Sequence, residues 1–143
     1  MSSKLDKETL HISVYSRIEA LSGDVNEMTL YTEATYRHER NKAFLMYEET
    51  ELSGMEGTKT LLTYDGVTLQ IKRYGQTNNL LRIEKGVEFE NTYQTPYGTF
   101  IMKTTGESIL WDDSGQLSIE LVYRLDINED VSNVTIKIDA ERK

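Results

Sequence analysis

The chain has 143 residues and no cysteine, and its 24 acidic against 16 basic residues give a formal net charge of −8. This length predicts a single domain, and the absence of cysteine excludes disulfides, thiolate catalysis and cysteine-ligated metals. The charge argues against nucleic acid as a partner, because binding to phosphates depends on basic side chains that replace counterions. The basic residues are scattered along the chain and form no dense stripe.

The amino-terminal segment, residues 1–8, is polar and mixed in charge and lacks the apolar core of a signal peptide. No apolar run approaches the roughly 20 residues that a membrane helix needs. We therefore predict a cytoplasmic protein with no membrane partner. We expect a single β-barrel domain over residues 1–143, with residues 1–8 as a flexible tail.

From about Leu10 onward, apolar and polar residues alternate in short runs, and each run ends at a turn signal. A period of two residues is typical of half-buried strands. The run over 80–84 is the weakest, and a short helix is the alternative there; residues 51–57 are predicted to form a loop. The predicted strands are, in chain order, Leu10–Glu19, Met28–Tyr36, Ala43–Glu49, Thr58–Tyr64, Val67–Tyr74, Leu80–Glu84, Val87–Tyr93, Thr99–Trp111, Leu117–Ile127 and Val134–Ile138.

Two turns carry the clearest local signals. Asp65-Gly66 between alternating runs predicts a two-residue type I′ hairpin, in which both central residues have positive φ. The only proline, Pro96, precedes Tyr97-Gly98 and predicts a second hairpin, because proline presets φ and glycine accepts the left-handed region. Gly106, inside a long predicted strand, indicates a bulge or bend.

Almost every predicted connection is short, and short connections join strands that are neighbours in a sheet. About ten amphipathic strands in such a meander leave two unpaired edges unless the sheet closes on itself. The predicted fold class is therefore all-β, a single antiparallel meander closed as an up-and-down barrel of about 8–10 strands.

A few polar residues share the phase of the inward apolar residues and mark a candidate ligand-binding site. The inward residues are expected to include Leu69, Phe89 and Ile119. Arg73 is in register with Val67, Leu69 and Ile71, and an inward arginine is costly unless acceptors meet it. One interpretation is a satisfied polar cluster that plugs a barrel end; the other is a cavity in which Arg73 holds an anionic ligand. The candidate residues are Arg73, Asn91, Tyr93 and Tyr123, together with Glu48 or Glu49, one of which must point inward.

Other residue types give weaker signals. His11 is on the polar phase of its strand and His38 is in a charged turn, so we expect both on the surface. No metal site, cofactor motif, phosphate-binding loop or nucleophile–base pair is recognisable, and we predict no cofactor and no catalytic residue. Trp111, at a strand end, is expected to cap the barrel.

The chain resembles the YwiB-like family of uncharacterised bacterial proteins over nearly its whole length. The order and spacing of several short motifs carry this resemblance. The family is similar to lipocalin-type (calycin) barrels in fold, and the resemblance implies no activity, cofactor or catalytic residue. The motifs are Tyr47-Glu48-Glu49, Ile71-Lys72-Arg73-Tyr74-Gly75, Tyr93-Gln94-Thr95-Pro96-Tyr97-Gly98, Thr104-Thr105 and Tyr123-Arg124-Leu125.

Three hypotheses about function follow from these observations. The first is a lipocalin-like barrel that binds a small anionic or amphipathic molecule with Arg73 as anchor. The second is a non-enzymatic interaction module or homodimer with a filled barrel, which pairs through an edge strand or through outward tyrosines (Tyr15, Tyr31 and Tyr74). The third hypothesis is an enzyme. It ranks last because the chain lacks a base–nucleophile pair.

Overall fold

The computed structural model describes residues 8–49, 57–75 and 78–141, and in these ranges it contains ten strands and no helix. Residues 1–7 of the predicted tail and most of the predicted loop over 51–57 lie outside the described residues. Glu8, predicted as part of the tail, begins the first strand. The strands are β1 (Glu8–Ala20), β2 (Val25–Glu39), β3 (Lys42–Glu48), β4 (Thr58–Tyr64), β5 (Thr68–Gly75), β6 (Asn79–Glu84), β7 (Glu88–Thr95), β8 (Gly98–Asp112), β9 (Ser118–Ile127) and β10 (Asp130–Glu141).

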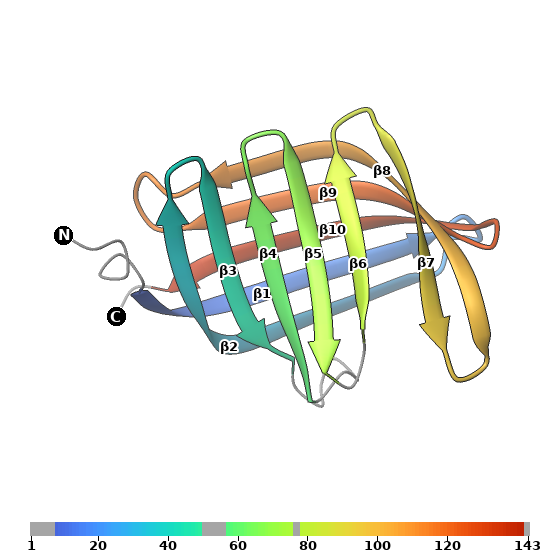
Figure 1. Cartoon of the computed structure of the whole chain (residues 1–143), viewed down its shortest axis with the longest axis horizontal. Helices are drawn as coiled ribbons and strands as arrows, with labels where there is room; N and C mark the ends of the chain where they lie inside the picture. The colour runs from blue at the N-terminus through green and yellow to red at the C-terminus, as the bar shows by residue number, and fades with distance from the viewer. Residues whose placement is uncertain (1–7, 50–56, 76–77, 142–143) are drawn as a thin grey trace.

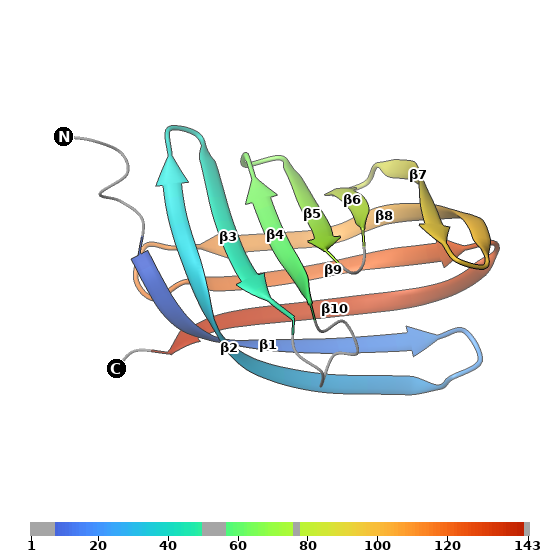
Figure 2. The ribbon, with the colours of Figure 1, turned by 60° about the horizontal axis from the view of Figure 1, so that its bottom comes forward.

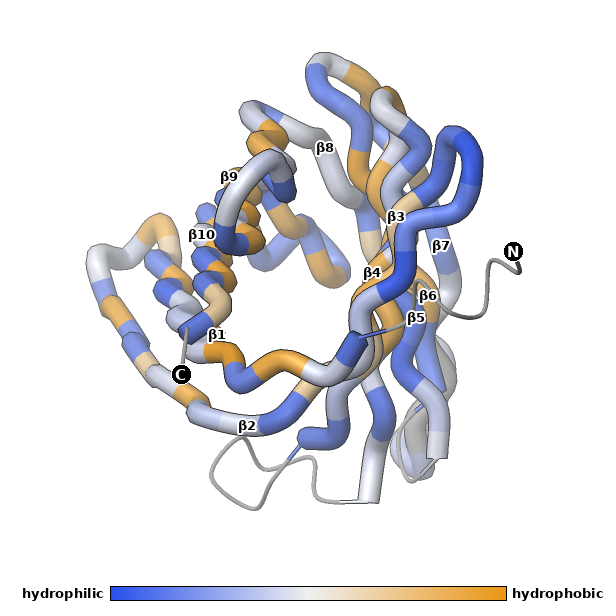
Figure 3. Tube along the Cα trace, turned by 90° about the vertical axis from the view of Figure 1, so that its left-hand side faces the viewer, coloured by the Kyte–Doolittle hydropathy of each residue, from blue (hydrophilic) through white to orange (hydrophobic). Residues whose placement is uncertain are grey.

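All ten strands belong to one antiparallel sheet with the order β6-β5-β4-β3-β2-β1-β10-β9-β8-β7 (Figure 1). Neighbours in this order are consecutive in the chain except for the β1–β10 pair, which joins the two halves of the meander; the consecutive strands β6 and β7 stand at the two ends of the order. Viewed from one end, the strands form a ring (Figure 3). The predicted all-β, lipocalin-like up-and-down barrel is confirmed.

The ring closes where the end of β6 meets β8, and we call this contact the β6/β8 seam (residues 82–86 against 104–106). The Thr104 hydroxyl donates to the Arg82 carbonyl at 2.5 Å, and the Gly86 N–H donates to the Gly106 carbonyl at 2.9 Å. A Cβ on Gly106 would lie 2.6 Å from the Glu84 carbonyl oxygen. Glycine is therefore needed for the close approach of two backbones here.

The barrel interior is an apolar core, built from the inward phase of the strands. Leu69, Phe89 and Ile119 were predicted to share one enclosed side; Leu69 and Ile119 are fully buried, and Phe89, on β7, is half-buried. The largest fully buried apolar side chains come from β1, β3, β5, β6, β9 and β10: Ile12, Leu45, Leu69, Ile71, Ile83, Ile119, Leu121 and Ile138. The two-residue rhythm of the sequence therefore predicted the interior face correctly.

The structure corrects one predicted turn. The β4–β5 connection has three residues, Asp65 to Val67, and of these only Gly66 has positive φ, at 97°. The Asp65 carboxylate accepts the N–H groups of Val67 and Thr68 at 2.9 and 2.8 Å, which stabilises the wider turn. Val67, predicted to point inward, lies in this turn with 59 % of its surface exposed.

The other local predictions agree with the structure. Pro96 and Tyr97 form the two-residue connection between β7 and β8. The β8–β9 register shifts between Gly106 and Ser108, which confirms the predicted bulge. The ambiguous segment over 80–84 is a strand, β6.

Candidate functional site

Four inward side chains form a polar row across one end of the barrel. Tyr47, Thr60, Arg73 and Asn79 are directly opposite one another on the adjacent strands β3, β4, β5 and β6. Tyr47 and Thr60 are buried, and Arg73 and Asn79 are half-buried. Each takes the inward phase, so the same alternation that builds the core places them together.

Glu49 adds a buried carboxylate to this row. Its N–H donates to the Thr58 carbonyl at 2.8 Å, which extends the β3–β4 pairing past the end of β3. Its side chain is only 4 % exposed, and its Oε2 accepts the Thr60 hydroxyl at 2.5 Å. Glu48 points outward and is exposed. Of the two acids predicted as alternatives, Glu49 is therefore the one that points inward. Glu48 points outward because successive side chains of a strand face opposite sides.

The Arg73 guanidinium is near Glu49 but is not hydrogen-bonded to it. Arg73 Nε lies 4.0 Å from Glu49 Oε2, beyond the range of an N–H···O bond, although the Arg73 side chain is only 17 % exposed. Among the residues that the structure describes, Arg73 Nε is buried without a hydrogen-bond partner. The Nε–H group of Arg73 is therefore a buried donor without an acceptor in the described part of the chain.

Two amide side chains, one on β6 and one on β7, also have a buried atom without a hydrogen-bond partner in the part of the chain that the structure describes. Asn79 Oδ1 and Asn91 Nδ2 are buried and have no hydrogen-bond partner among the described residues. Asn91 belongs to β7 and lies level with the start of β6, because the Glu84–Val87 bridge fixes the register of the two strands. Figure 1 shows β6 and β7 diverging from this bridge toward the end that carries the polar row.

Two tyrosine hydroxyls complete the cluster. Burial raises the pKa of Tyr47 above the ordinary value, the Glu49 charge raises it further, and the Arg73 charge and a hydrogen bond with Thr60 oppose this shift. Burial also raises the pKa of Tyr123, on β9, and the positive charge of Arg73 opposes it. Both phenols therefore stay protonated at neutral pH and can donate hydrogen bonds, which suits binding of acceptor groups.

The structure brings part of the predicted set together. Arg73, Glu49 and Tyr123 belong to one electrostatic cluster, and Asn91 is on the strand across from Asn79. The Tyr93 side chain lies outside the described part of the chain. Sequence reasoning missed Tyr47, Thr60 and Asn79. The inward phase of the third and fourth strands would have identified Tyr47 and Thr60, because both follow it.

The opposite end of β4 carries a different cluster, in which hydrogen bonds join Tyr36, Trp111 and Asp113. The Tyr36 hydroxyl donates to Asp113 at 2.6 Å and accepts the Trp111 indole N–H at 3.1 Å. The Trp111 ring stacks on Tyr64 with 5.3 Å between centroids. This arrangement agrees with the predicted capping role of Trp111, and the polar atoms of Tyr36 and Trp111 have partners at this end.

The remaining candidates contribute little to the site. His11 lies on the outward phase of β1, and its Nε2 is 3.7 Å from the Glu33 carboxylate on the neighbouring strand. His38 follows the inward phase of β2, opposite Ala43, but it is exposed near the end of the strand, so both histidines are on the surface as predicted. Within residues 8–49, 57–75 and 78–141, no group of three histidines or acids could hold a metal ion. In the same ranges, no helix has the length and apolar character needed to cross a membrane.

The fold and this cluster define a class: small up-and-down β-barrels with a polar group of side chains at one end of an apolar interior. The chain belongs to the family described as "Domain of unknown function (DUF1934)", which matches residues 12–139. This family match and the similarity to the solved structure described next together confirm the resemblance to YwiB-like proteins.

One solved structure is similar over nearly the whole molecule. The crystal structure of the ywiB protein from Bacillus subtilis matches with a TM-score of 0.76 and 23 % sequence identity, over 96 % of this chain and 94 % of that one. At this identity the likeness shows a shared fold. No curated protein matches the chain.

Proposed function

We propose that this protein binds a small anionic or amphipathic molecule at the end of the barrel that carries the polar row, with Arg73 as the anchor. The observation that carries the proposal is the buried Arg73 Nε, which has no hydrogen-bond acceptor among the described residues. An unsatisfied buried donor costs roughly 1–3 kcal/mol, and more when it is charged. A ligand oxygen at the guanidinium would remove this cost.

The chemistry of the neighbours favours an oxygen-rich head group. Arginine presents five N–H donors in a planar fork that matches a carboxylate or a phosphate. Glu49 does not use this fork, because its Oε2 is 4.0 Å from Nε and already accepts the Thr60 hydroxyl. The Asn91 amide nitrogen is a further unused donor.

The walls next to the row favour an apolar body on the same ligand. Ile71 precedes Arg73 on the inward phase of β5, and Leu81 follows Asn79 on that of β6. Both side chains are almost completely buried in the interior. A molecule with an anionic head and a short apolar body would satisfy the guanidinium and stay in contact with these side chains.

The direct test measures binding of anilinonaphthalene sulfonate, an anionic probe with an apolar body, to the wild type and to Arg73→Ala. We expect the dissociation constant to rise about tenfold or more, because a charge-assisted hydrogen bond contributes about 1.5–3 kcal/mol. Lys72→Ala is the matched control, since Lys72 is the adjacent residue and its side chain is exposed on the outer face. Equal affinity of Arg73→Ala and Lys72→Ala would refute the proposal.

The natural ligand can be sought by native mass spectrometry of protein purified from its own host. We expect an additional mass on the wild type that is absent from Arg73→Ala. An adduct of the same mass and occupancy on both proteins would show that Arg73 does not hold it.

A further inference from the structure

The strand β2 has a long unpaired edge. It pairs with β1 along nearly all of its length, from Val25 to Tyr36, but it pairs with β3 only from Ala34 to Glu39. Among the described residues, no strand adjoins Val25–Glu33 on the β3 side. Figure 2 shows this part of β2 at the margin of the molecule, beyond the end of β3.

The backbone groups of this edge face outward in a regular pattern. The Ala20 N–H donates to the Asp24 carbonyl at 2.9 Å, so Ala20 and Asp24 form a hydrogen-bonded pair. Such pairs alternate along antiparallel strands, which directs the backbone of Met28 and Leu30 toward β1. The N–H and C=O groups of the odd-numbered residues from 25 to 33 therefore point to the open edge.

The side chains of the edge also favour association. Tyr31 is 68 % exposed and Val25 is 40 % exposed, although both belong to a strand. A long exposed edge with apolar side chains is a template for another strand. The shielding found on protected edges, a proline or a lysine, is absent from residues 25–33.

The sequence of the edge is complementary to itself in one register. When two copies pair antiparallel about Thr29, that residue lies opposite its own copy as a hydrogen-bonded pair, as the backbone direction requires. Glu27 then lies opposite Tyr31, and Glu33 lies opposite Val25. No like charges are directly opposite each other in this register, and Thr–Thr pairs across strands are favourable.

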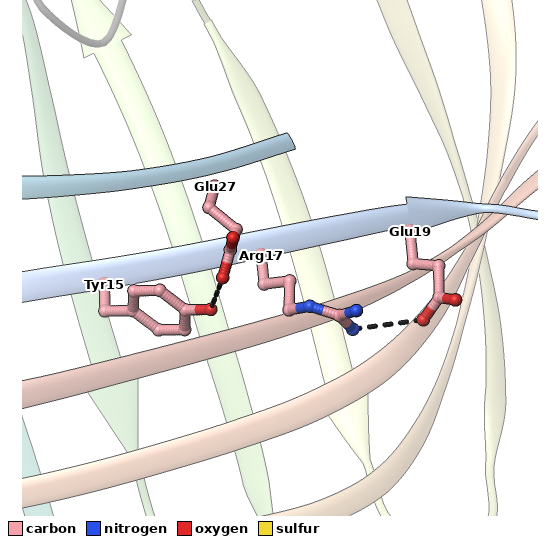
Figure 4. Close-up of polar contacts among 4 residues, drawn as sticks. All are labelled: Tyr15, Arg17, Glu19 and Glu27. Atoms are coloured by element: carbon pink, nitrogen blue, oxygen red, sulfur yellow. Dashed lines mark hydrogen bonds and ion pairs between the residues drawn. The ribbon is translucent and has the colours of Figure 1, made fainter. Parts of the chain in front are cut away.

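On the outer face of the β1–β2 hairpin, the hydrogen bond of Glu27 leaves one of its carboxylate oxygens available in this register. The Tyr15 hydroxyl donates to Glu27 Oε2, and Arg17 Nη1 contacts Glu19 Oε1 at 3.0 Å (Figure 4). Glu27 Oε1 is not used in that hydrogen bond. It can therefore accept the Tyr31 hydroxyl of the second copy.

We propose that two copies of this chain associate through their β2 edges, antiparallel and centred on Thr29, to form a sheet that is continuous across the dimer. The occupant of the edge is a second copy because the register above is self-complementary in charge and in backbone direction. This assembly is independent of the polar row.

The first test is sedimentation velocity of the wild type, of Tyr31→Glu and of Tyr31→Glu combined with Glu27→Lys. We expect a concentration-dependent dimer for the wild type. Tyr31→Glu places carboxylates opposite each other at two symmetric positions and should raise the dissociation constant about tenfold or more. The double variant restores opposite charges and should recover the dimer. Because Tyr31 is exposed, the circular dichroism spectrum should not change.

The second test uses the absence of cysteine from the chain. In the proposed register the two Thr29 Cα atoms are about 5.5 Å apart, within the range of a disulfide. Oxidised Thr29→Cys should therefore become a covalent dimer, and Thr63→Cys, on the outward phase of β4 between two paired strands, should not.

A wild type that is monomeric at every concentration, a dimer that Tyr31→Glu leaves unchanged, or a Thr29→Cys variant that cross-links no faster than Thr63→Cys would overturn the proposal. None of these results bears on Arg73, because ligand binding is measured with a separate probe and a separate variant.

Discussion

Replacement of Gly106 by alanine is the sharpest perturbation of the fold, because it acts at the β6/β8 seam. The added Cβ would lie 2.6 Å from the Glu84 carbonyl oxygen and 2.7 Å from the Glu84 carbonyl carbon. Both atoms belong to the backbone and cannot move aside as the end of a flexible side chain would. The seam must therefore open, at least in part.

The expected loss of stability follows from two contributions. Forcing extra volume into a packed site costs about 1–3 kcal/mol. Separation of the strands also weakens two hydrogen bonds, Thr104 to Arg82 and Gly86 to Gly106, each of which contributes about 0.5–1.5 kcal/mol. We expect Gly106→Ala to lower the free energy of unfolding by about 2–5 kcal/mol.

The assay is equilibrium denaturation in urea, with Gly115→Ala as the matched control. A Cβ on Gly115 meets no atom within 4 Å, and this glycine does not have positive φ. Its substitution should change the free energy of unfolding by no more than about 0.5–1 kcal/mol. Amide exchange adds a local measure, because the Gly86 N–H should exchange faster in Gly106→Ala. Equal stability of the two variants, with unchanged exchange at Gly86, would refute the role of the seam.

Three further predictions concern single side chains. Tyr36→Phe removes the donor to Asp113 and the acceptor for Trp111, and should lower the free energy of unfolding in urea by about 1–3 kcal/mol; an unchanged midpoint would contradict this. The raised pKa of Tyr47 adds stability that is complete below the unfolded value of 10.0 and is lost as pH rises through the folded pKa. Tyr47→Phe should therefore lose less stability than the wild type in alkaline denaturation, and equal losses would show that Tyr47 does not contribute. The N–H groups of the β4–β5 turn lower the pKa of Asp65, so its contribution is present above the unfolded value of 3.8 and is lost as pH falls through the folded pKa. Asp65→Asn should flatten the acid limb of a stability–pH curve, and a curve parallel to the wild type would refute the turn's role.

The architecture could be predicted from the sequence because one physical rule, the alternation of side chains along a strand, governs both burial and strand identity. Leu69 and Ile119 are about fifty residues apart, yet each was assigned to the interior from its immediate neighbours alone. The β4–β5 turn was predicted wrongly in type, because the Asp65 carboxylate accepts two N–H groups and stabilises a longer connection than the Asp-Gly pair suggests. Turn geometry depends on such side-chain bonds, which the residue pattern does not contain.

The candidate site was predictable only in part, for a related reason. Phase placed Arg73 and Tyr123 inside, but it left Glu48 and Glu49 as equal alternatives. The choice depends on how far the β3–β4 pairing extends, and the Glu49–Thr58 backbone bond decides it. Phase also could not show that the Arg73–Glu49 distance is 4.0 Å, because that distance depends on the Thr60 hydroxyl, which holds the carboxylate.

The two ends of the barrel differ in how their polar groups are used, and this difference supports a division of roles. Around Tyr64, the tyrosine, tryptophan and aspartate side chains satisfy one another, so this end contributes to stability and offers a ligand little that is unpaired. In the polar row at the other end of the same strand, Arg73 Nε and Asn79 Oδ1 stay unpaired among the described residues, as does Asn91 Nδ2 on β7. A protein under selection for stability alone would gain by replacing these groups with apolar side chains. Because these groups come from separate strands and face one interior, they support the proposal that a ligand binds at that end.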